Sequence, residues 1–142
     1  FEIDPAEVEL EVTESVLIDD TQRIISRLER LRDMGFKISI DDFGTGFSSL
    51  SYLKDMPANA LKIDKSFLDT LLQDQSTQVI TETMVYLSKK LDLVSIAEGV
   101  ETEKQFEYIR RMGVDVVQGY LMSKPVPKAE LEKLIQHEES YL

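Results

Sequence analysis

Lys37-Ile38-Ser39-Ile40-Asp41-Asp42-Phe43-Gly44-Thr45-Gly46 is the stretch of this chain that bears most directly on its fold. A short apolar run that begins at Ile38 ends in two adjacent carboxylates, and the glycines behind them let the backbone turn tightly. Side chains of a (β/α) barrel converge where its parallel strands end. An acidic strand end of this kind therefore indicates a catalytic floor, with a metal site as the first hypothesis.

Four further stretches repeat this arrangement, in which an apolar run ends in a polar or acidic residue and a helix-like segment follows. They end at Glu11, Asp64, Glu98 and Gln118. Successive strand ends lie between 20 residues (Glu98 to Gln118) and 34 residues (Asp64 to Glu98) apart, close to the roughly 31 per unit of an eight-unit barrel of about 250 residues. The sequence predicts an α/β fold, a TIM-like (β/α) barrel, here a partial barrel of about five βα units. The alternation alone also fits an open doubly wound sheet.

Helix signals fill the gaps between the predicted strands. Apolar residues recur at helical spacing from Asp20 or Thr21 to Gly35, in residues 76–91 and in residues 127–137. Thr102 and Gln105 form a capping-box pattern. Because no linker or low-complexity tract interrupts the chain, we expect one domain over residues 1–142.

Composition narrows the class of function. Twenty-seven acidic residues against sixteen basic ones give a net charge of -11. This balance argues against a DNA or RNA duplex as partner, because phosphate backbones are held by clusters of Lys and Arg. An anionic ligand would need divalent cations to approach the acidic strand ends.

The chain has no cysteine and a single histidine, His137, which has acidic neighbours and is predicted at the surface. Thiolate and imidazole ligands are therefore not expected, and a cysteine-free chain is compatible with a reducing cytoplasm. No apolar run approaches the roughly 18 residues of a membrane span. We expect a cytoplasmic domain, whose parent protein could be anchored only through a region outside this chain.

The Asp41-Asp42 pair can reach two cations, or one cation and a bridging water. Two ions about 3.5 to 4 Å apart can activate a water and stabilise both oxygens of an in-line phosphoryl displacement. The plain alternative is a polar turn, but Glu11 and Glu98 at other strand ends favour the metal site. An all-oxygen ligand set favours Mg²⁺ or Mn²⁺, with Ca²⁺ as an inhibitory or structural substitute.

The neighbouring acidic residues differ in how clearly the sequence places them. Glu11 lies on the opposite face of its strand from the apolar residues, whereas Glu14 lies beyond the strand and could cap a helix or steady a loop. Glu98 shares its alternation with Val94 and Ile96, so we expect a bulge or the strand end to redirect it. Glu101 follows Glu98 at the same interval as Glu14 follows Glu11.

Lys62 occupies a strand position in which a solvated lysine would be out of place. Near carboxylates it could hold a water or offset phosphate charge. The alternative is a lysine that reaches solvent and pairs with Asp64. Gln118 could orient a water or a polar edge of a ligand, or be an ordinary strand-end amide.

Together, five segments resemble the EAL-domain family of cyclic-di-GMP phosphodiesterases. They are Glu11-Val-Thr-Glu14-Ser15, Asp41-Asp42-Phe-Gly-Thr-Gly-Phe-Ser-Ser-Leu50, Leu61-Lys62-Ile63-Asp64, Ala97-Glu98-Gly-Val-Glu101-Thr102, and Gln118-Gly-Tyr120 with Ser123-Lys124-Pro125. They follow one another in the family's order and spacing over nearly the whole chain. The resemblance implies a TIM-like barrel that hydrolyses one phosphodiester bond of cyclic-di-GMP to linear pGpG with Mg²⁺ or Mn²⁺.

The resemblance also implies roles for individual residues. Four carboxylates would be metal ligands: Glu11, Asp41, Asp42 and Glu98. Lys62 would be the partner of the hydrolytic water, and Gln118 would lie in the same floor. Glu14 would support the loop of residues 42–48, which in the family couples the metal site to dimerisation, and Glu101 would be a second supporting carboxylate.

Two family features are not found in this sequence, the Glu-Ala-Leu motif and an asparagine ligand that precedes the position of Glu11. We therefore expect residues 1–142 to be the C-terminal portion of a single EAL domain, to hydrolyse little or nothing alone, and to expose sheet edges. Exposed edges favour a homodimer or a domain-swapped association. The parent protein could carry sensory or GGDEF-type domains.

Two other functions fit parts of the pattern. One is a regulatory module that binds cyclic-di-GMP or a protein partner without hydrolysis, although family members of that kind usually have damaged metal motifs. The other is an enolase-like barrel in which Lys62 abstracts a proton. The aspartate pair with its Gly-Thr-Gly loop fits phosphodiester cleavage better.

Overall fold

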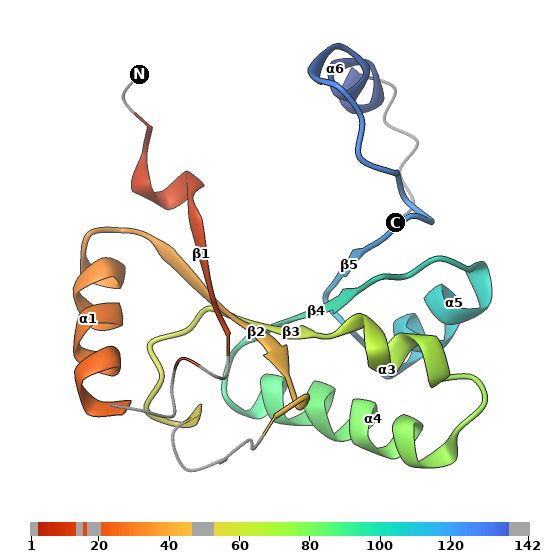
Figure 1. The fold of residues 1–142 in the computed structure, drawn as a ribbon, viewed down its shortest axis with the longest axis horizontal. Helices are drawn as coiled ribbons and strands as arrows, with labels where there is room; N and C mark the ends of the chain where they lie inside the picture. Colours follow the sequence, from red (N-terminus) through yellow and green to blue (C-terminus); the bar gives the residue numbers. More distant parts are fainter. Residues whose placement is uncertain (1–2, 14–15, 17–20, 47–52, 137–142) are drawn as a thin grey trace.

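The computed structural model of the chain describes residues 3–13, 16, 21–46 and 53–136 (Figure 1). Strands and helices alternate along the sequence. In chain order they are η1 (Pro5–Glu7), β1 (Glu9–Thr13), α1 (Thr21–Asp33), β2 (Lys37–Phe43), β3 (Ala60–Ile63), α3 (Lys65–Thr70), α4 (Gln75–Lys90), β4 (Val94–Glu98), α5 (Glu103–Met112), β5 (Val116–Gln118) and α6 (Lys128–Gln136).

The five strands form one parallel sheet in the order β1-β2-β3-β4-β5. Each strand pairs with the next in sequence, so the sheet has no reversal of strand order of the kind that defines a doubly wound fold. The sheet does not close on itself, and β1 and β5 each have one neighbour. These features confirm the predicted α/β partial barrel of five βα units.

One face of the sheet is covered by helices and forms the core. Apolar side chains of the central strands on this face are fully buried, among them Ile38, Ile40, Leu61 and Ile63. Helices α1, α3, α4 and α5 lie on this side of the sheet (Figure 1). Burying each such Ile or Leu side chain contributes about 1.5 to 3 kcal/mol, so this layer fixes the positions of the strand ends.

The opposite face carries the charged residues and has no helix of the described chain over it. Register and alternation place Glu11, Ser39 and Lys62 on this inner face. Val94 and Val116 lie on it too and are 43% and 44% exposed. In a closed barrel the inner face would be packed with side chains from all the strands.

The expectation that Glu98 must be redirected is wrong. Ser95 and Ala97 are the fully buried residues of β4 and face the helices, so Val94, Ile96 and Glu98 all lie on the inner face. Branched apolar side chains also fill the inside of a barrel. The apolar character of Val94 and Ile96 therefore did not identify the helix side of β4.

The helix predictions are confirmed within about two residues. Asp74 caps α4 by accepting hydrogen bonds from the backbone N–H groups of Ser76 and Thr77, and α5 has the capping box of Thr102 and Gln105. Of the final predicted helix, α6 covers Lys128–Gln136, while His137 lies outside the described residues.

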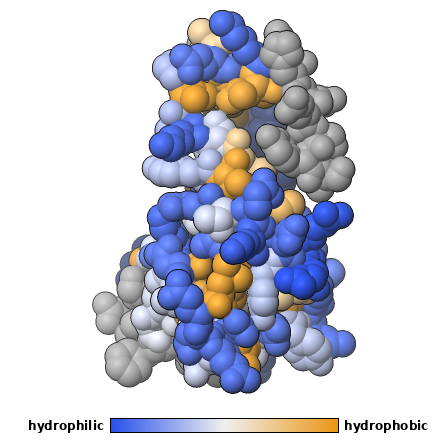
Figure 2. All heavy atoms as spheres, turned by 90° about the vertical axis from the view of Figure 1, so that its right-hand side faces the viewer, coloured by the Kyte–Doolittle hydropathy of each residue, from blue (hydrophilic) through white to orange (hydrophobic). Residues whose placement is uncertain are grey.

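Helix α6 stands away from the layer formed by α3, α4 and α5 (Figure 1). Its apolar residues Leu131, Leu134 and Ile135 are exposed, and Figure 2 shows apolar side chains at the surface of this upper part of the molecule. None of the described helices combines the length and apolar character needed to cross a membrane.

Candidate functional site

Lys62 lies at the centre of a cluster of carboxylates on the inner face. Its Nζ is 2.8 Å from Oε1 of Glu98 and 3.2 Å from Oδ1 of Asp41, and it also donates a hydrogen bond to Glu11. The Lys62 side chain is only 5% exposed. Residues from β1, β2, β3 and β4 thus meet at the carboxyl ends of four adjacent strands, as the sequence predicted.

A bulge in β2 sets the positions of the two adjacent aspartates. Ile40 pairs with Leu61 and Phe43 with Ile63, so Asp41 and Asp42 together lie opposite Lys62 alone. Asp42 has a φ of 55°, in the left-handed region that Asp and Asn tolerate better than most residues. Bulges commonly re-aim side chains beside active sites, and this one keeps both aspartates next to Lys62.

The charges of the cluster act on one another. Burial by itself would lower the pKa of Lys62, but its hydrogen bonds with Glu11 and Glu98 outweigh burial and raise the pKa above that of an ordinary lysine. Burial and the negative charge of Asp41 raise the pKa of Asp42. Lys62 is therefore a firmly held cation, and Asp42 remains in an excess of negative charge.

Comparison with known proteins agrees with this arrangement. The family model described as the EAL domain matches residues 1–125. This chain belongs to the EAL domain family. The fold, with its five parallel strands and covering helices, is that of the EAL domains that it resembles in structure.

Relatives of this EAL domain include named phosphodiesterases. It is 45% identical over 129 residues to the cyclic di-GMP phosphodiesterase NbdA of Pseudomonas aeruginosa, covering 91% of this chain and 16% of NbdA. In structure it resembles PaMucR phosphodiesterase in complex with c-di-GMP, at a TM-score of 0.87 and 46% identity, covering 91% of this chain and 52% of that one. The chain thus spans only a small part of the length of the curated relatives it matches.

A third comparison bears on metals. Klebsiella pneumoniae BlrP1, which is 32% identical at a TM-score of 0.80, has structures with manganese or calcium and cyclic-di-GMP. The match covers 87% of this chain and 31% of BlrP1. BlrP1 is thus a structural relative whose complexes contain a divalent cation together with the dinucleotide.

The inner-face residues of this EAL domain fit such a cation by their chemistry. Oδ1 of Asp41 is buried and has no hydrogen-bond partner of acceptable geometry among the described residues, although it lies 3.2 Å from Lys62 Nζ. Carboxylate oxygens without imidazole or thiolate are the donors preferred by Mg²⁺ and Mn²⁺. Among the described residues no three acidic or histidine side chains are arranged as a ready ligand set, because the carboxylates converge on the ammonium of Lys62.

The remaining predicted site residues occupy different surroundings. Gln118 pairs with Glu98 in the sheet register and is exposed. Glu101 lies further out and forms an ion pair with Lys65, at the start of α3. Glu14 lies outside the described residues, as do residues 47–48 of the predicted loop.

The alternative in which Lys62 pairs with Asp64 is wrong. Asp64 is the N-cap of α3, and its carboxylate accepts hydrogen bonds from the backbone N–H and the hydroxyl of Ser66. Burial raises the pKa of Asp64, but these hydrogen bonds outweigh burial and lower it overall. The carboxylate of Asp64 therefore caps the first turn of α3 rather than pairing with Lys62.

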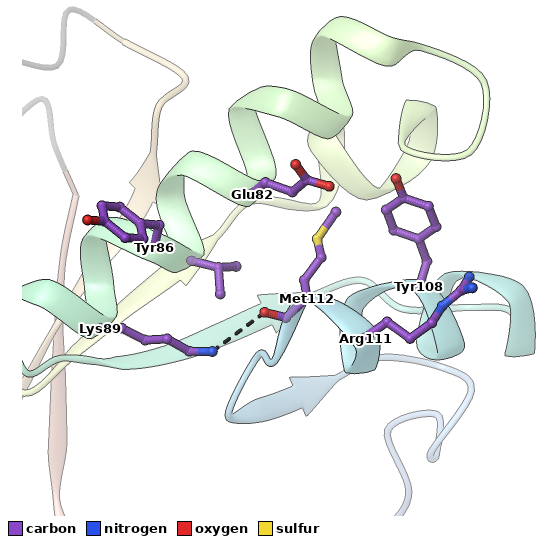
Figure 3. Close-up of a pocket in the computed structure, with 7 residues that line it drawn as sticks. Glu82, Tyr86, Lys89, Tyr108, Arg111 and Met112 are labelled. Atoms are coloured by element: carbon purple, nitrogen blue, oxygen red, sulfur yellow. Dashed lines mark hydrogen bonds between the residues drawn. The ribbon is translucent and has the colours of Figure 1, made fainter.

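A groove in the outer layer is separate from this cluster. It lies between α4 and α5 and is lined by Glu82, Val85, Tyr86, Lys89, Tyr108, Arg111 and Met112. Lys89 reaches the carbonyl of Met112 at 3.5 Å across it (Figure 3). None of the predicted site residues lines the groove, since it is on the helix side of the sheet.

Sequence reasoning missed Ser39 in the cluster. Its hydroxyl is buried on the inner face and has no hydrogen-bond partner in the described part of the chain. Ser39 pairs with Glu11 in the sheet register. Its alternation with Asp41 along β2 was the available signal. A buried hydroxyl that can donate or accept is suited to a neighbouring water or carboxylate.

Proposed function

We propose that this EAL domain is part of a phosphodiesterase that hydrolyses one phosphodiester bond of cyclic-di-GMP to linear pGpG. The observation that carries the proposal is the convergence of Glu11, Asp41 and Glu98 on the buried ammonium of Lys62. Phosphoryl transfer depends on positioning and on stabilising negative charge. A cluster of oxygen donors around a fixed cation at the strand ends provides both.

We further propose that Glu11, Asp41, Asp42 and Glu98 hold Mg²⁺ or Mn²⁺, and that Ca²⁺ binds without supporting turnover. When bound, such ions supply an activated water and stabilise the oxygens of the displaced phosphate. Two observations support this assignment. Oδ1 of Asp41 is buried and makes no hydrogen bond within the described part of the chain, although it lies 3.2 Å from Lys62 Nζ, and burial together with the charge of Asp41 raises the pKa of Asp42, so negative charge accumulates where a cation would be favoured.

Lys62 acts in this proposal as a hydrogen-bond donor. Its raised pKa keeps it protonated at neutral pH, so it can donate to the attacking water or to a phosphate oxygen, and it orients Glu11 and Glu98 at the same time. A protonated lysine cannot abstract a proton, which disfavours the enolase-like alternative. Gln118 orients a polar group in the same floor, and Glu14 and Glu101 are supporting carboxylates.

The wider setting of the domain is part of the proposal. The residues lacking here, the Glu-Ala-Leu motif and an asparagine, would complete the ligand set, so residues 1–142 alone should hydrolyse little. The open edges β1 and β5 favour pairing with a second copy. Among the relatives, Escherichia coli DosP is named an oxygen sensor protein and Pseudomonas aeruginosa MucR a bifunctional diguanylate cyclase/cyclic di-GMP phosphodiesterase. These names support a signalling protein with sensory or GGDEF-type domains, and we also propose that the domain is cytoplasmic.

The test is conversion of cyclic-di-GMP to pGpG by the full-length protein in Mg²⁺ or Mn²⁺. We expect Glu98→Gln to lower kcat at least about 100-fold, since an electrostatic contact to the reacting groups is lost. The exposed Glu103→Gln, in the first turn of α5, is the matched control and should keep wild-type kcat. Tight binding without product in the wild-type protein would replace the proposal with the non-catalytic, ligand-binding function.

A further inference from the structure

Two contacts join helix α3 to the segment that follows Glu98. Lys65, the first residue of α3, forms an ion pair with Glu101. Nε2 of Gln105 donates to the backbone carbonyl of Leu68 in α3 at 2.9 Å, and Gln105 is 8% exposed. The ion pair joins α3 to the connection after β4, and the hydrogen bond joins α3 to the first turn of α5. Both contacts lie beyond the last pair of the sheet register between β3 and β4, Ile63 with Ala97.

Gln105 also holds the connection itself. Its Oε1 accepts hydrogen bonds from the backbone N–H groups of Glu101 at 3.0 Å and Thr102 at 2.9 Å. One amide side chain therefore binds the start of α5 through its oxygen and α3 through its nitrogen. A buried amide with all these bonds formed fixes its neighbours in a single arrangement.

Besides its ion pair with Glu101, Lys65 makes a packing contact with the backbone after Glu98. Gly99 has a φ of 71°, and a Cβ added to it would overlap Cβ and Cγ of Lys65. The aliphatic part of Lys65 thus lies directly against the backbone one residue after Glu98. On the other side, a Cβ on Gly119 would overlap the backbone of Val100, so residues 99–100 are enclosed from both sides.

We propose that Gln105 and Lys65 are positioning residues that set the distance between Glu98 and Lys62. Lys62 lies three residues before Lys65 and Glu98 one residue before Gly99, so the two contacts tie together the chain segments that carry the 2.8 Å pair of Lys62 and Glu98. Among the described residues, the side-chain hydrogen bonds and ion pair of Lys65 and Gln105 go to Glu101, Thr102 and Leu68, outside the inner-face cluster. The inference rests on the proposed phosphodiesterase function, and it names no further contact to the dinucleotide.

Gln105→Glu is the informative variant. A glutamate keeps the acceptor of the capping box but has no N–H for the Leu68 carbonyl, so the tie to α3 is lost while the helix start is kept. Gln78→Glu is the matched control, because Gln78 Nε2 makes the same kind of bond to the carbonyl of Leu71, also at 2.9 Å, between α4 and the end of α3.

In the full-length protein we expect Gln105→Glu to lower kcat for cyclic-di-GMP about ten-fold with KM little changed, since small misplacements of reacting groups cost rate more than binding. Gln78→Glu should keep wild-type kcat. Lys65→Met, which retains the apolar stem but not the charge, should lower kcat less, and Lys65→Arg should restore it. If Gln105→Glu does not fold, the Lys65 variants still test the inference, because the Lys65 side chain is exposed and its replacement should not prevent folding.

Amide hydrogen exchange of residues 99–102 is the second measurement. Gln105→Glu should exchange faster there than both wild type and Gln78→Glu. Equal kcat and equal exchange in the two glutamate variants would overturn the inference. If the wild-type protein does not hydrolyse cyclic-di-GMP, the proposed function fails, whereas the exchange comparison still decides whether these residues hold the segment after Glu98.

Discussion

Replacing Lys62 by Met tests the charge cluster most directly. Methionine has a similar apolar stem and removes only the ammonium that contacts Glu11, Asp41 and Glu98. The lysine side chain is 5% exposed, Asp41 and Glu98 are each 19% exposed and Glu11 is 52% exposed. Two of the three carboxylates are therefore left largely desolvated without their cation.

The size of the effect follows from this burial. Removing one partner of a buried ion pair costs about 3 to 5 kcal/mol, whereas exposed pairs contribute about 0 to 1 kcal/mol. Because Glu11 is half exposed and the cluster opens on the inner face, we expect Lys62→Met to lower the free energy of unfolding by about 2 to 3 kcal/mol in a chelator.

Divalent cations should reverse part of this loss. With the ammonium gone, the carboxylates can turn their oxygens to an added ion, and Mn²⁺ at 100 times its Kd would stabilise the folded state by about 2.7 kcal/mol. The assay is urea unfolding in EDTA and in Mn²⁺ for wild type and Lys62→Met. Lys104→Met, an exposed lysine of α5, is the control and should change stability by less than about 0.5 kcal/mol. A Lys62→Met protein as stable as wild type in EDTA would refute the reasoning.

Three further changes have defined outcomes. Asp42→Asn should stabilise the protein in EDTA at pH 7, because the raised pKa of Asp42 means that its ionised form is unfavourable in the fold. This gain should vanish at a pH below 3.8, the ordinary pKa of Asp, which urea midpoints measured at both pH values would show. Mn²⁺ binding by the same variant, measured by calorimetry, should weaken. Gly119→Ala should lower the free energy of unfolding, measured in urea, by about 1 to 3 kcal/mol or more, since its Cβ meets the backbone of Val100. Gly35→Ala, with 3.5 Å to its nearest neighbour, should show only the cost of its positive φ, about 1 to 2 kcal/mol. Thr102→Ala removes the N-cap of α5 and should lower thermal stability by about 1 kcal/mol, with equal stability contradicting the cap.

The strands could be predicted because each apolar run is short and ends in a polar residue. The position of Lys62 among carboxylates followed from the convergence of parallel strand ends. Which face of β4 packs against the helices could not be predicted, because Val94 and Ile96 are as apolar as the buried Ala97. Alternation states which residues share a face, but not which face the helices cover.

Contacts between side chains and backbone groups that are distant in the chain could not be predicted from the sequence. Gln105 was expected only as part of a capping box, and its bond to Leu68, 37 residues away, depends on how α3 and α5 pack. The bulge that places Asp41 and Asp42 opposite Lys62 likewise arises from pairing between two strands. Glu14 and its proposed support of the loop of residues 42–48 stay predictions.

A cluster that contains its own counter-ion has a consequence for how the protein would bind the proposed cation. Zinc fingers unfold without their ion because metal binding supplies the free energy that folds them. Here the ammonium of Lys62 offsets the charge of the carboxylates around it, so folding need not wait for a cation. If the proposed metal site is correct, the domain stays folded, and protected from the proteases that remove unfolded proteins, whether or not the cation is bound.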